Sequence, residues 1–258
     1  MRYHYLDTEI AKSDQKISVN LIGVGGTGSH MLTNLAILSS TLVKLGHNPF
    51  FVRVFDPDVI TEHNVGRQAF AMSDIGKNKA EVLVSRCNRY FGTQWSSFPH
   101  KFELTSYMPS GDFLSANLSI SCVDSIDSRR QILEVMGKHS SYQTFQTYKR
   151  NCYWMDIGNS ARTGQVILGT MIDTFQPKKS RGVKKLRHFF DEYPNVEDDF
   201  SEPSCSLADS LFKQDLFINK IMATYAADIL WNLFHKFGIS YRGVYVNLET
   251  LKSSPIPI

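Results

Sequence analysis

The sequence LIGVGGTGSH, at residues 21–30, constrains the fold of this chain more than any other stretch. It follows a short apolar run typical of a buried strand, and it leads into a segment of helical periodicity. In such a turn, backbone N–H groups can approach a phosphate, because glycine has no side chain in the way and adopts φ values that other residues avoid. The glycines that we expect to line a phosphate are Gly23, Gly25, Gly26 and Gly28.

The pattern around this turn predicts an α/β protein. Residues 17–22 and 50–56 are apolar enough for buried strands, and residues 29–45 between them have helical spacing. Strand, helix and strand in this order form a βαβ unit, which implies a right-handed crossover and a parallel sheet. Further strands are expected at residues 117–124, 153–158, 165–170 and, as the last one, 243–249; helices are expected at 74–91 (capped by Asp74), 125–139 and 207–237.

The length of 258 residues suits one domain, residues 1–258, with a sizeable core. Residues 173–204 differ from the rest, because six basic side chains between positions 178 and 187 are followed by an acidic block. We interpret this stretch as a long crossover loop, and we expect it to cover the tail of a protein partner and its basic half to meet an acidic face of that partner. A solvated run of charges is the alternative.

Composition excludes several other classes. The net charge of +3 is too small to indicate nucleic-acid binding by itself, and no apolar run approaches the roughly 18 residues of a membrane span. The first residues lack the apolar region of a secretory signal, so we expect a cytoplasmic protein. The cysteines form no C-x-x-C pair, and we expect neither zinc nor a disulfide framework. They are Cys87, Cys122, Cys152 and Cys205.

The glycine turn alone fits either a dinucleotide for hydride transfer or ATP. Asp56, at the end of the second strand, is placed to bind the ribose of either nucleotide. The residues that follow favour ATP, because attack on its α-phosphate builds negative charge that cationic and amide groups stabilise, whereas the phosphates of a hydride carrier stay intact. These residues are Asp58, Asn64, Arg67, Gln68 and Lys79. Asp124, at the end of a later strand, is placed to bind Mg²⁺, or alternatively to cap the next helix.

Four motifs closely resemble the superfamily of ThiF, MoeB and the ubiquitin-activating enzymes: GVGGTG, DPDVITEHNVGRQ, DIGKNKA and VDSIDSRR. They lie within residues 17–130, and a similarity to the ThiF-type proteins of PRTRC systems extends over nearly the whole chain. The resemblance implies a Rossmann-like ThiF-type fold, with a largely parallel sheet, helices on both faces, a long C-terminal helix and a final strand. It also implies that a homodimer uses ATP and Mg²⁺ to adenylate the C-terminal carboxylate of a ubiquitin-like β-grasp carrier protein, releasing pyrophosphate.

The resemblance also assigns roles to single residues. The four glycines cradle the phosphates, Asp56 binds the ribose, Asp124 holds Mg²⁺, and Arg129 is structural or faces the substrate. The triphosphate and the attacking carboxylate are surrounded by Asn64, Arg67, Gln68 and Lys79.

Two departures from the family pattern leave other functions open. Arg2 is the only arginine before residue 53, so an arginine donated to a partner subunit from this segment is missing, and the C-x-x-C pairs of zinc-binding relatives are absent. A nucleotide-binding scaffold without turnover is therefore one alternative, and an NAD-linked oxidoreductase is a more remote one. Cys205 stands where the crossover loop meets the long helix, a place where a helix N-terminus favours the thiolate, so it is a candidate for a thioester with the carrier.

Overall fold

The computed structural model describes residues 3–66, 68–103, 114–140, 151–178, 180–186 and 216–258, with backbone only at 138–140. Its main sheet has the strand order β10-β9-β7-β6-β5-β2-β3-β4. The strands are β2 (Ile17–Ile22), β3 (Phe50–Phe55), β4 (Ser96–Phe98), β5 (Leu118–Ser121), β6 (Tyr153–Asn159), β7 (Thr163–Thr170), β9 (Tyr241–Asn247) and β10 (Lys252–Pro257), with a separate small pair formed by β1 (His4–Tyr5) and β8 (Gly238–Ile239). The helices are α1 (Thr8–Lys12), α2 (Gly26–Lys44), α3 (Lys79–Phe91), α4 (Ile126–Ser140) and α7 (Ile218–His235).

The centre of the sheet is parallel, as expected. β2 pairs in parallel with β3 and with β5, and β5 pairs in parallel with β6. In this register Ile22 lies opposite both Phe55 and Ser121, so three strands end at the same edge of the sheet. β7, β9 and β10 then continue the sheet in antiparallel pairings.

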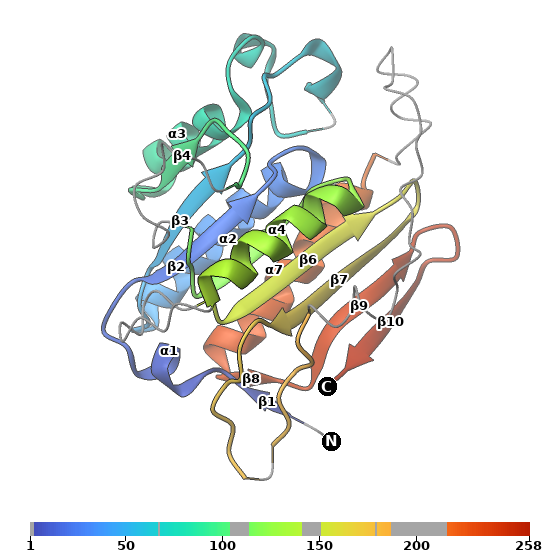
Figure 1. Cartoon of the computed structure of the whole chain (residues 1–258). Coiled ribbons are helices and arrows are strands. Elements are labelled where there is room, and N and C mark those ends of the chain that lie inside the picture. The colour runs from blue at the N-terminus through green and yellow to red at the C-terminus, as the bar shows by residue number, and fades with distance from the viewer. Residues whose placement is uncertain (1–2, 67, 104–113, 141–150, 179, 187–215) are drawn as a thin grey trace.

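Helices cover both faces of the sheet (Figure 1), which confirms the predicted Rossmann-like α/β class. Alternate strand residues belong to two cores: Leu21 packs with α2, α3 and α7, whereas Ile22 packs with α4. Burying a leucine or isoleucine side chain contributes roughly 1.5–3 kcal/mol, so a shift of one residue in register would be costly. Within the described ranges, no helix is both long and apolar enough to cross a membrane.

The start of α3 differs from the prediction. Asn78, not Asp74, is its N-cap, because the Asn78 side chain accepts a hydrogen bond from the Glu81 N–H at 3.1 Å. Asp74 instead ends a short 3₁₀ turn, where it accepts from the Ala71 N–H at 2.9 Å and pairs with Arg86 at 2.7 Å. Both are residue types that cap helices well, and a turn at Gly76 (φ +85°) separates Asp74 from the start of α3.

The prediction that residues 243–249 form the last strand was wrong. β9 is followed by β10, which pairs with it antiparallel at the edge of the sheet. Pro255 and Pro257 are unfavourable for a strand in general, because proline has no N–H to donate. An edge strand tolerates it, since one side of the strand faces no neighbour.

The described part of the crossover loop lies far from the glycine turn. Thr170, at the end of β7, pairs with Tyr153, the first residue of β6, so residues 171–186 follow from the opposite edge of the sheet (Figure 1). There the Val183 N–H donates to the His4 ring, and Lys185 pairs with Asp173 at 2.9 Å. Contact of the loop with a protein partner stays a prediction, and residues 179 and 187–204 lie outside the described ranges.

Candidate active site

The glycine turn lies at the edge where β2, β3 and β5 end together. The Gly23 N–H donates to the Phe55 carbonyl at 2.9 Å, and the Cys122 N–H donates to the Ile22 carbonyl at 2.8 Å. Gly23 has a φ of +82°, which other residues rarely adopt. A Cβ on Gly28 would lie 2.0 Å from the Gly23 carbonyl oxygen, so only glycine lets α2 start this close to the strand.

The first turn of α2 presents free N–H groups. Its N-cap is Gly25, no described side chain caps it, and its first turn contains no acidic residue. The first helical hydrogen bond runs from the Ser29 N–H to the Gly25 carbonyl at 3.1 Å. The three preceding N–H groups therefore have no helical partner, and they add to the positive end of the helix dipole, which makes this turn suitable for an anion.

Two carboxylates and an ammonium group lie beside the turn. Asp56 is buried, and its two oxygens accept from the N–H groups of Val24 (2.6 Å) and Asp58 (2.9 Å), while burial raises the pKa of Asp56. It thus holds the turn, although each oxygen keeps a second lone pair that a ribose hydroxyl could use. Lys79 is buried at the start of α3, and its Nζ pairs with the exposed Asp58 carboxylate at 2.8 Å.

Gln68 presents its side-chain amide to Gly25 of the glycine turn. Its amide nitrogen lies 3.9 Å from the position that a Cβ would take on Gly25, and the residue is only 8% exposed. Its Oε1 has no hydrogen-bond partner among the described residues. A buried amide oxygen without a partner is costly, so this one is suited to a ligand.

Of the two predicted site residues Asn64 and Arg67, only Asn64 belongs to the described part of the chain. The Asn64 side-chain oxygen accepts from the Thr61 N–H at 2.9 Å, which stabilises a 3₁₀ turn and leaves the amide NH₂ group for another partner. Arg67 lies outside the described residues. Among the described residues, Gln68 thus lies beside Gly25, Lys79 pairs with Asp58, and Asn64 stabilises its own turn.

Asp124 follows β5 and is exposed. The alternative role of helix cap belongs to its neighbour: Ser125 Oγ accepts from the Ser128 N–H at 3.1 Å at the start of α4. The chain after β5 lies against the turn, because the Cys122 carbonyl oxygen is 3.0 Å from the Cβ position of Gly23. Asp124 therefore follows β5 at the same edge of the sheet as the glycine turn. Among the described residues, no cluster of three or more His, Cys, Asp or Glu side chains forms a complete metal site.

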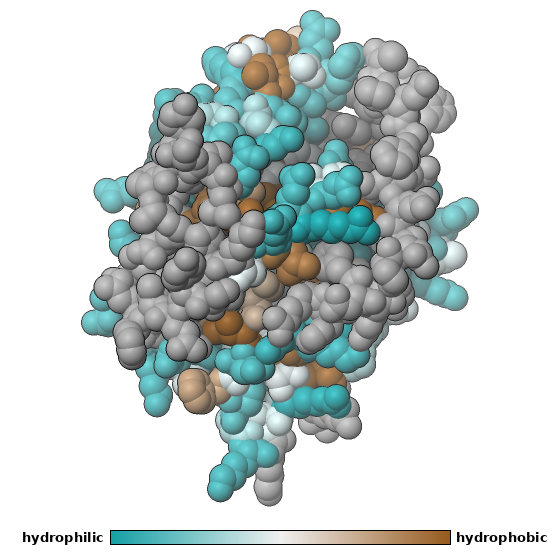
Figure 2. All heavy atoms as spheres, in the orientation of Figure 1, coloured by the Kyte–Doolittle hydropathy of each residue, from teal (hydrophilic) through white to brown (hydrophobic). Residues whose placement is uncertain are grey.

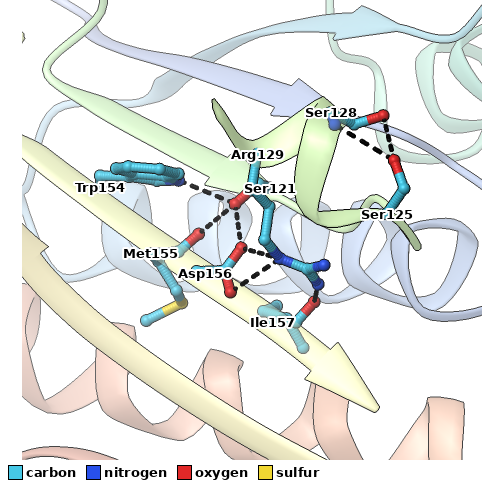
Figure 3. A network of polar contacts seen from close by, with 8 residues as sticks. All are labelled: Ser121, Ser125, Ser128, Arg129, Trp154, Met155, Asp156 and Ile157. Atoms are coloured by element: carbon cyan, nitrogen blue, oxygen red, sulfur yellow. Dashed lines mark hydrogen bonds and ion pairs between the residues drawn. The ribbon is translucent and has the colours of Figure 1, made fainter. Parts of the chain in front are cut away.

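Arg129 lies in a buried polar network, not in an open site (Figure 3). Its Nε donates to both oxygens of Asp156, at 3.0 and 3.1 Å, and its side chain is only 12% exposed. Ser121 donates to the same carboxylate at 2.6 Å and accepts from the indole N–H of Trp154 at 2.7 Å. The network therefore connects the first turn of α4 to the end of β5 and to residues within β6, which favours a structural role for Arg129.

A second polar cluster was not expected from the sequence. Asn219, on the first turn of α7, lies against the first turn of α2, where its Oδ1 accepts from the Thr27 hydroxyl at 2.8 Å. Asn159, the last residue of β6, donates to the same oxygen at 3.3 Å. The sequence could not predict this contact, because Thr27 and Asn219 are far apart in the chain. Both also belong to segments whose apolar pattern predicts helices packed in the core.

The segment between β3 and α3 exposes large apolar side chains beside the site. Val59, Met72 and Ile75 are 52%, 64% and 37% exposed. In Figure 2 apolar spheres gather at the upper end of the molecule, where Figure 1 shows this segment. An exposed apolar group of this kind often marks a place where another protein binds.

The described cysteines are poorly placed to act as nucleophiles. Cys87 and Cys152 are buried, and burial raises the pKa of Cys122, which lies under the glycine turn, so its thiol stays protonated. None of these three forms a disulfide with a described residue. Cys205 lies outside the described residues, and its role stays a prediction.

Fold and site together define a class: an α/β protein with an anion-binding helix N-terminus at the carboxyl edge of a parallel sheet. The ThiF family matches residues 7–253, so the chain belongs to the ThiF family. No comparison separates the PRTRC branch from the rest, and a search of curated proteins gave no match.

Solved structures show the same fold. PaaA is similar with a TM-score of 0.60 and 15% identity, over 97% of this chain and 65% of PaaA. A structure of E. coli MccB with ATP is similar with a TM-score of 0.54 and 15% identity, over 97% of this chain and 66% of MccB. A structure of E. coli MccB with MccA is similar at the same TM-score of 0.54 and 15% identity, over 97% of this chain and 65% of MccB. The chain thus spans about two thirds of the length of these proteins.

Proposed function

We propose that this protein is an ATP-dependent adenylyltransferase that activates the C-terminal carboxylate of a ubiquitin-like β-grasp carrier protein. The observation that supports this most is the first turn of α2, which no described side chain caps, next to the buried amide oxygen of Gln68, which has no partner within the described ranges. Together they offer N–H donors for phosphate and one unused acceptor, at the same edge as Lys79 and Asp124. Similarity to the structure of MccB with ATP favours ATP over a dinucleotide.

The proposed reaction forms one bond and breaks one. A carboxylate oxygen of the carrier attacks the α-phosphorus of ATP, the bond between the α-phosphorus and the bridging oxygen breaks, and pyrophosphate leaves. The carboxylate is already ionised at neutral pH, so the protein supplies position and charge and no general base. The N–H groups of α2 and the Lys79 ammonium group would stabilise the charge on the phosphoryl oxygens.

Mg²⁺ fits the donors at this edge, although no complete protein site exists among the described residues. Mg²⁺ commonly takes one or two carboxylates and completes its shell with water and substrate phosphates. Asp124 would hold it here, since Ser125 caps α4 in its place. The ion would neutralise charge on the phosphates.

The substrate is a protein in this proposal, and two observations support that. Val59, Met72 and Ile75 offer apolar surface next to Asp58 and Lys79. The similar E. coli protein MccB has been solved together with MccA. We further propose that the protein is cytoplasmic and acts as a homodimer. A scaffold that binds nucleotide without turnover is the alternative, and catalysis distinguishes the two.

The test is ATP–pyrophosphate exchange with small β-grasp proteins encoded beside the gene. We expect exchange that depends on the carrier and on Mg²⁺, and that is lost when the carrier lacks its last residue. ATP with Mg²⁺ should also raise the melting temperature, because a ligand that binds only the folded state stabilises it, and NAD⁺ should not. ATP binding without exchange would support the scaffold, and stronger stabilisation by NAD⁺ would exclude adenylation.

A further inference from the structure

The first turn of α2 is held by a residue that comes from the other end of the fold. Asn219 is 2% exposed and lies on the first turn of α7. A Cβ on Gly26 would lie 2.6–2.7 Å from the three terminal atoms of the Asn219 side chain. Gly26 does not have a positive φ, so its lack of a side chain serves to admit this amide and not to relieve backbone strain.

Hydrogen bonds fix the amide in this place. Its Oδ1 accepts from the Thr27 hydroxyl at 2.8 Å and from the Asn159 amide at 3.3 Å, and the Thr27 hydroxyl also lies 3.0 Å from the Asn159 Oδ1. Thr27 is itself buried. Three elements therefore meet at one point: the start of α2, the end of β6 and the start of α7.

The rest of the α7 turn is packed just as closely. A Cβ on Gly164, which pairs with Asn159 across β6 and β7, would lie 2.7 Å from the sulfur of Met222. The start of α7 thus has little freedom to shift. A rigid partner of this kind can hold the adjacent turn of α2 in one geometry.

We propose that Asn219 is a positioning residue for the nucleotide. By holding Thr27 it keeps the N–H groups of Gly26, Thr27 and Gly28 directed at the phosphates. The inference rests on the proposed function, because it assigns the geometry of that same anion site. Preorganised donors bind better than donors that must be ordered on binding, so the loss of Asn219 should be measured as weaker ATP binding.

The experiment measures ATP·Mg²⁺ affinity by calorimetry, at a temperature well below the melting point of each variant. Asn219→Ala should weaken ATP binding about tenfold, the size expected for one buried hydrogen bond. Asn232→Ala is the matched control: it removes the same amide from the same helix, but in the part of the chain that the structure describes that amide donates to Asp228 one turn away. Its ATP affinity should equal that of the wild type.

A double-mutant cycle separates positioning from a general loss of structure. Thr27→Val removes the hydroxyl and Thr27→Ser keeps it, so only the valine variant should reproduce the defect of Asn219→Ala. In the Thr27→Val protein, Asn219→Ala should add nothing. Additive effects would show that Asn219 does not act through Thr27.

Gly26→Ala tests the contact between Gly26 and Asn219 independently. Its new methyl group collides with the Asn219 amide, so it should bind ATP poorly, and Asn219→Ala in the same chain should restore binding to the level of Asn219→Ala alone. Asn219→Ala that melts lower but binds ATP like the wild type would leave a structural role only and overturn the inference. A wild-type protein that binds no ATP would contradict the proposed function itself, and the inference with it.

Discussion

The side chain of Gln68 lies 3.9 Å from the position that a Cβ would take on Gly25, and its buried oxygen has no partner among the described residues. A group of this kind lowers the stability of the free protein, by roughly 1–3 kcal/mol. We therefore expect Gln68→Leu to leave the nucleotide-free protein as stable as before or more stable, while ATP binding weakens. Urea unfolding and calorimetry measure the two effects. Gln131→Leu, at an exposed position on α4, is the control and should change neither. A parallel loss of stability and affinity would mean that Gln68 is simply part of the core.

Asp124 and Ser125 are neighbours with different expected roles. Ser125→Ala should remove the cap of α4 and cost about 1 kcal/mol of stability, with activity largely kept. Asp124→Ala should leave stability unchanged and reduce pyrophosphate exchange by roughly 100-fold or more, if its carboxylate holds the metal near the reacting phosphate. Thermal melting and exchange on both variants distinguish the roles. Equal exchange by Asp124→Ala and the wild type would remove Asp124 from the site.

The buried pair of Arg129 and Asp156 predicts a loss of stability with a specific rescue. Arg129→Met leaves the Asp156 carboxylate buried without its cation, which should cost about 3–5 kcal/mol. Arg129→Met combined with Asp156→Leu removes both charges and should regain much of that loss. Denaturant unfolding measures both. If Arg129→Met were stable but inactive, the arginine would have to contact the substrate.

His4 predicts a loss of stability in mild acid. Its ring is fully buried, it contacts the Tyr153 hydroxyl at 3.0 Å and the Val183 N–H at 3.1 Å, and burial lowers its pKa to about 4. Below about pH 6.5 the unfolded chain takes up a proton that the folded chain binds only near pH 4, so stability falls as the pH decreases through this window. A shift from 6.5 to about 4 corresponds to about 3 kcal/mol.

The variant for this prediction is His4→Gln, which should flatten the pH dependence of urea unfolding between pH 6.5 and 4. The control is His63→Gln, which replaces an exposed histidine. The same slope in wild type and His4→Gln would assign the acid sensitivity to other groups.

Cys205 is predicted to carry the carrier as a thioester. Incubation of protein, carrier and ATP, followed by a non-reducing gel, should give a conjugate that thiols cleave. The conjugate should be absent from Cys205→Ser and present in Cys152→Ser, because Cys152 is buried. Exchange activity without any conjugate would leave adenylation as the whole reaction.

The sequence predicted the fold well where local pattern and tertiary structure agree. The apolar run of β2, the glycine turn and the periodicity of α2 all lie within thirty residues of one another, and the structure has them as expected. β10 was missed because its prolines are unfavourable for strands in general and acceptable only at an edge, and an edge is a property of the whole sheet. Asp74 was predicted to cap α3, but Asn78 is the cap, because its side chain accepts a hydrogen bond from the Glu81 N–H.

The sequence predicted the location of the candidate site in the fold better than it predicted the partners of the residues there. The sequence indicated Gln68, Lys79 and Asp124, and the structure places them at one edge of the sheet. It did not indicate that Arg129 is paired with Asp156, or that Asn219 reaches Gly26. Those contacts join residues from separate strands and helices, so they follow from topology and from the space that glycines leave, neither of which has a local pattern.

The contact between Thr27 and Asn219 has a consequence for synthesis of the chain, because the two residues are 192 positions apart. At typical translation rates of about 5–20 residues per second, Thr27 is added to the chain roughly 10–40 s before Asn219. During that interval the nascent chain has the turn but not the residue that holds it. ATP should therefore protect ribosome-bound chains from protease only after α7 has emerged, and binding of the nucleotide would report completion of the fold.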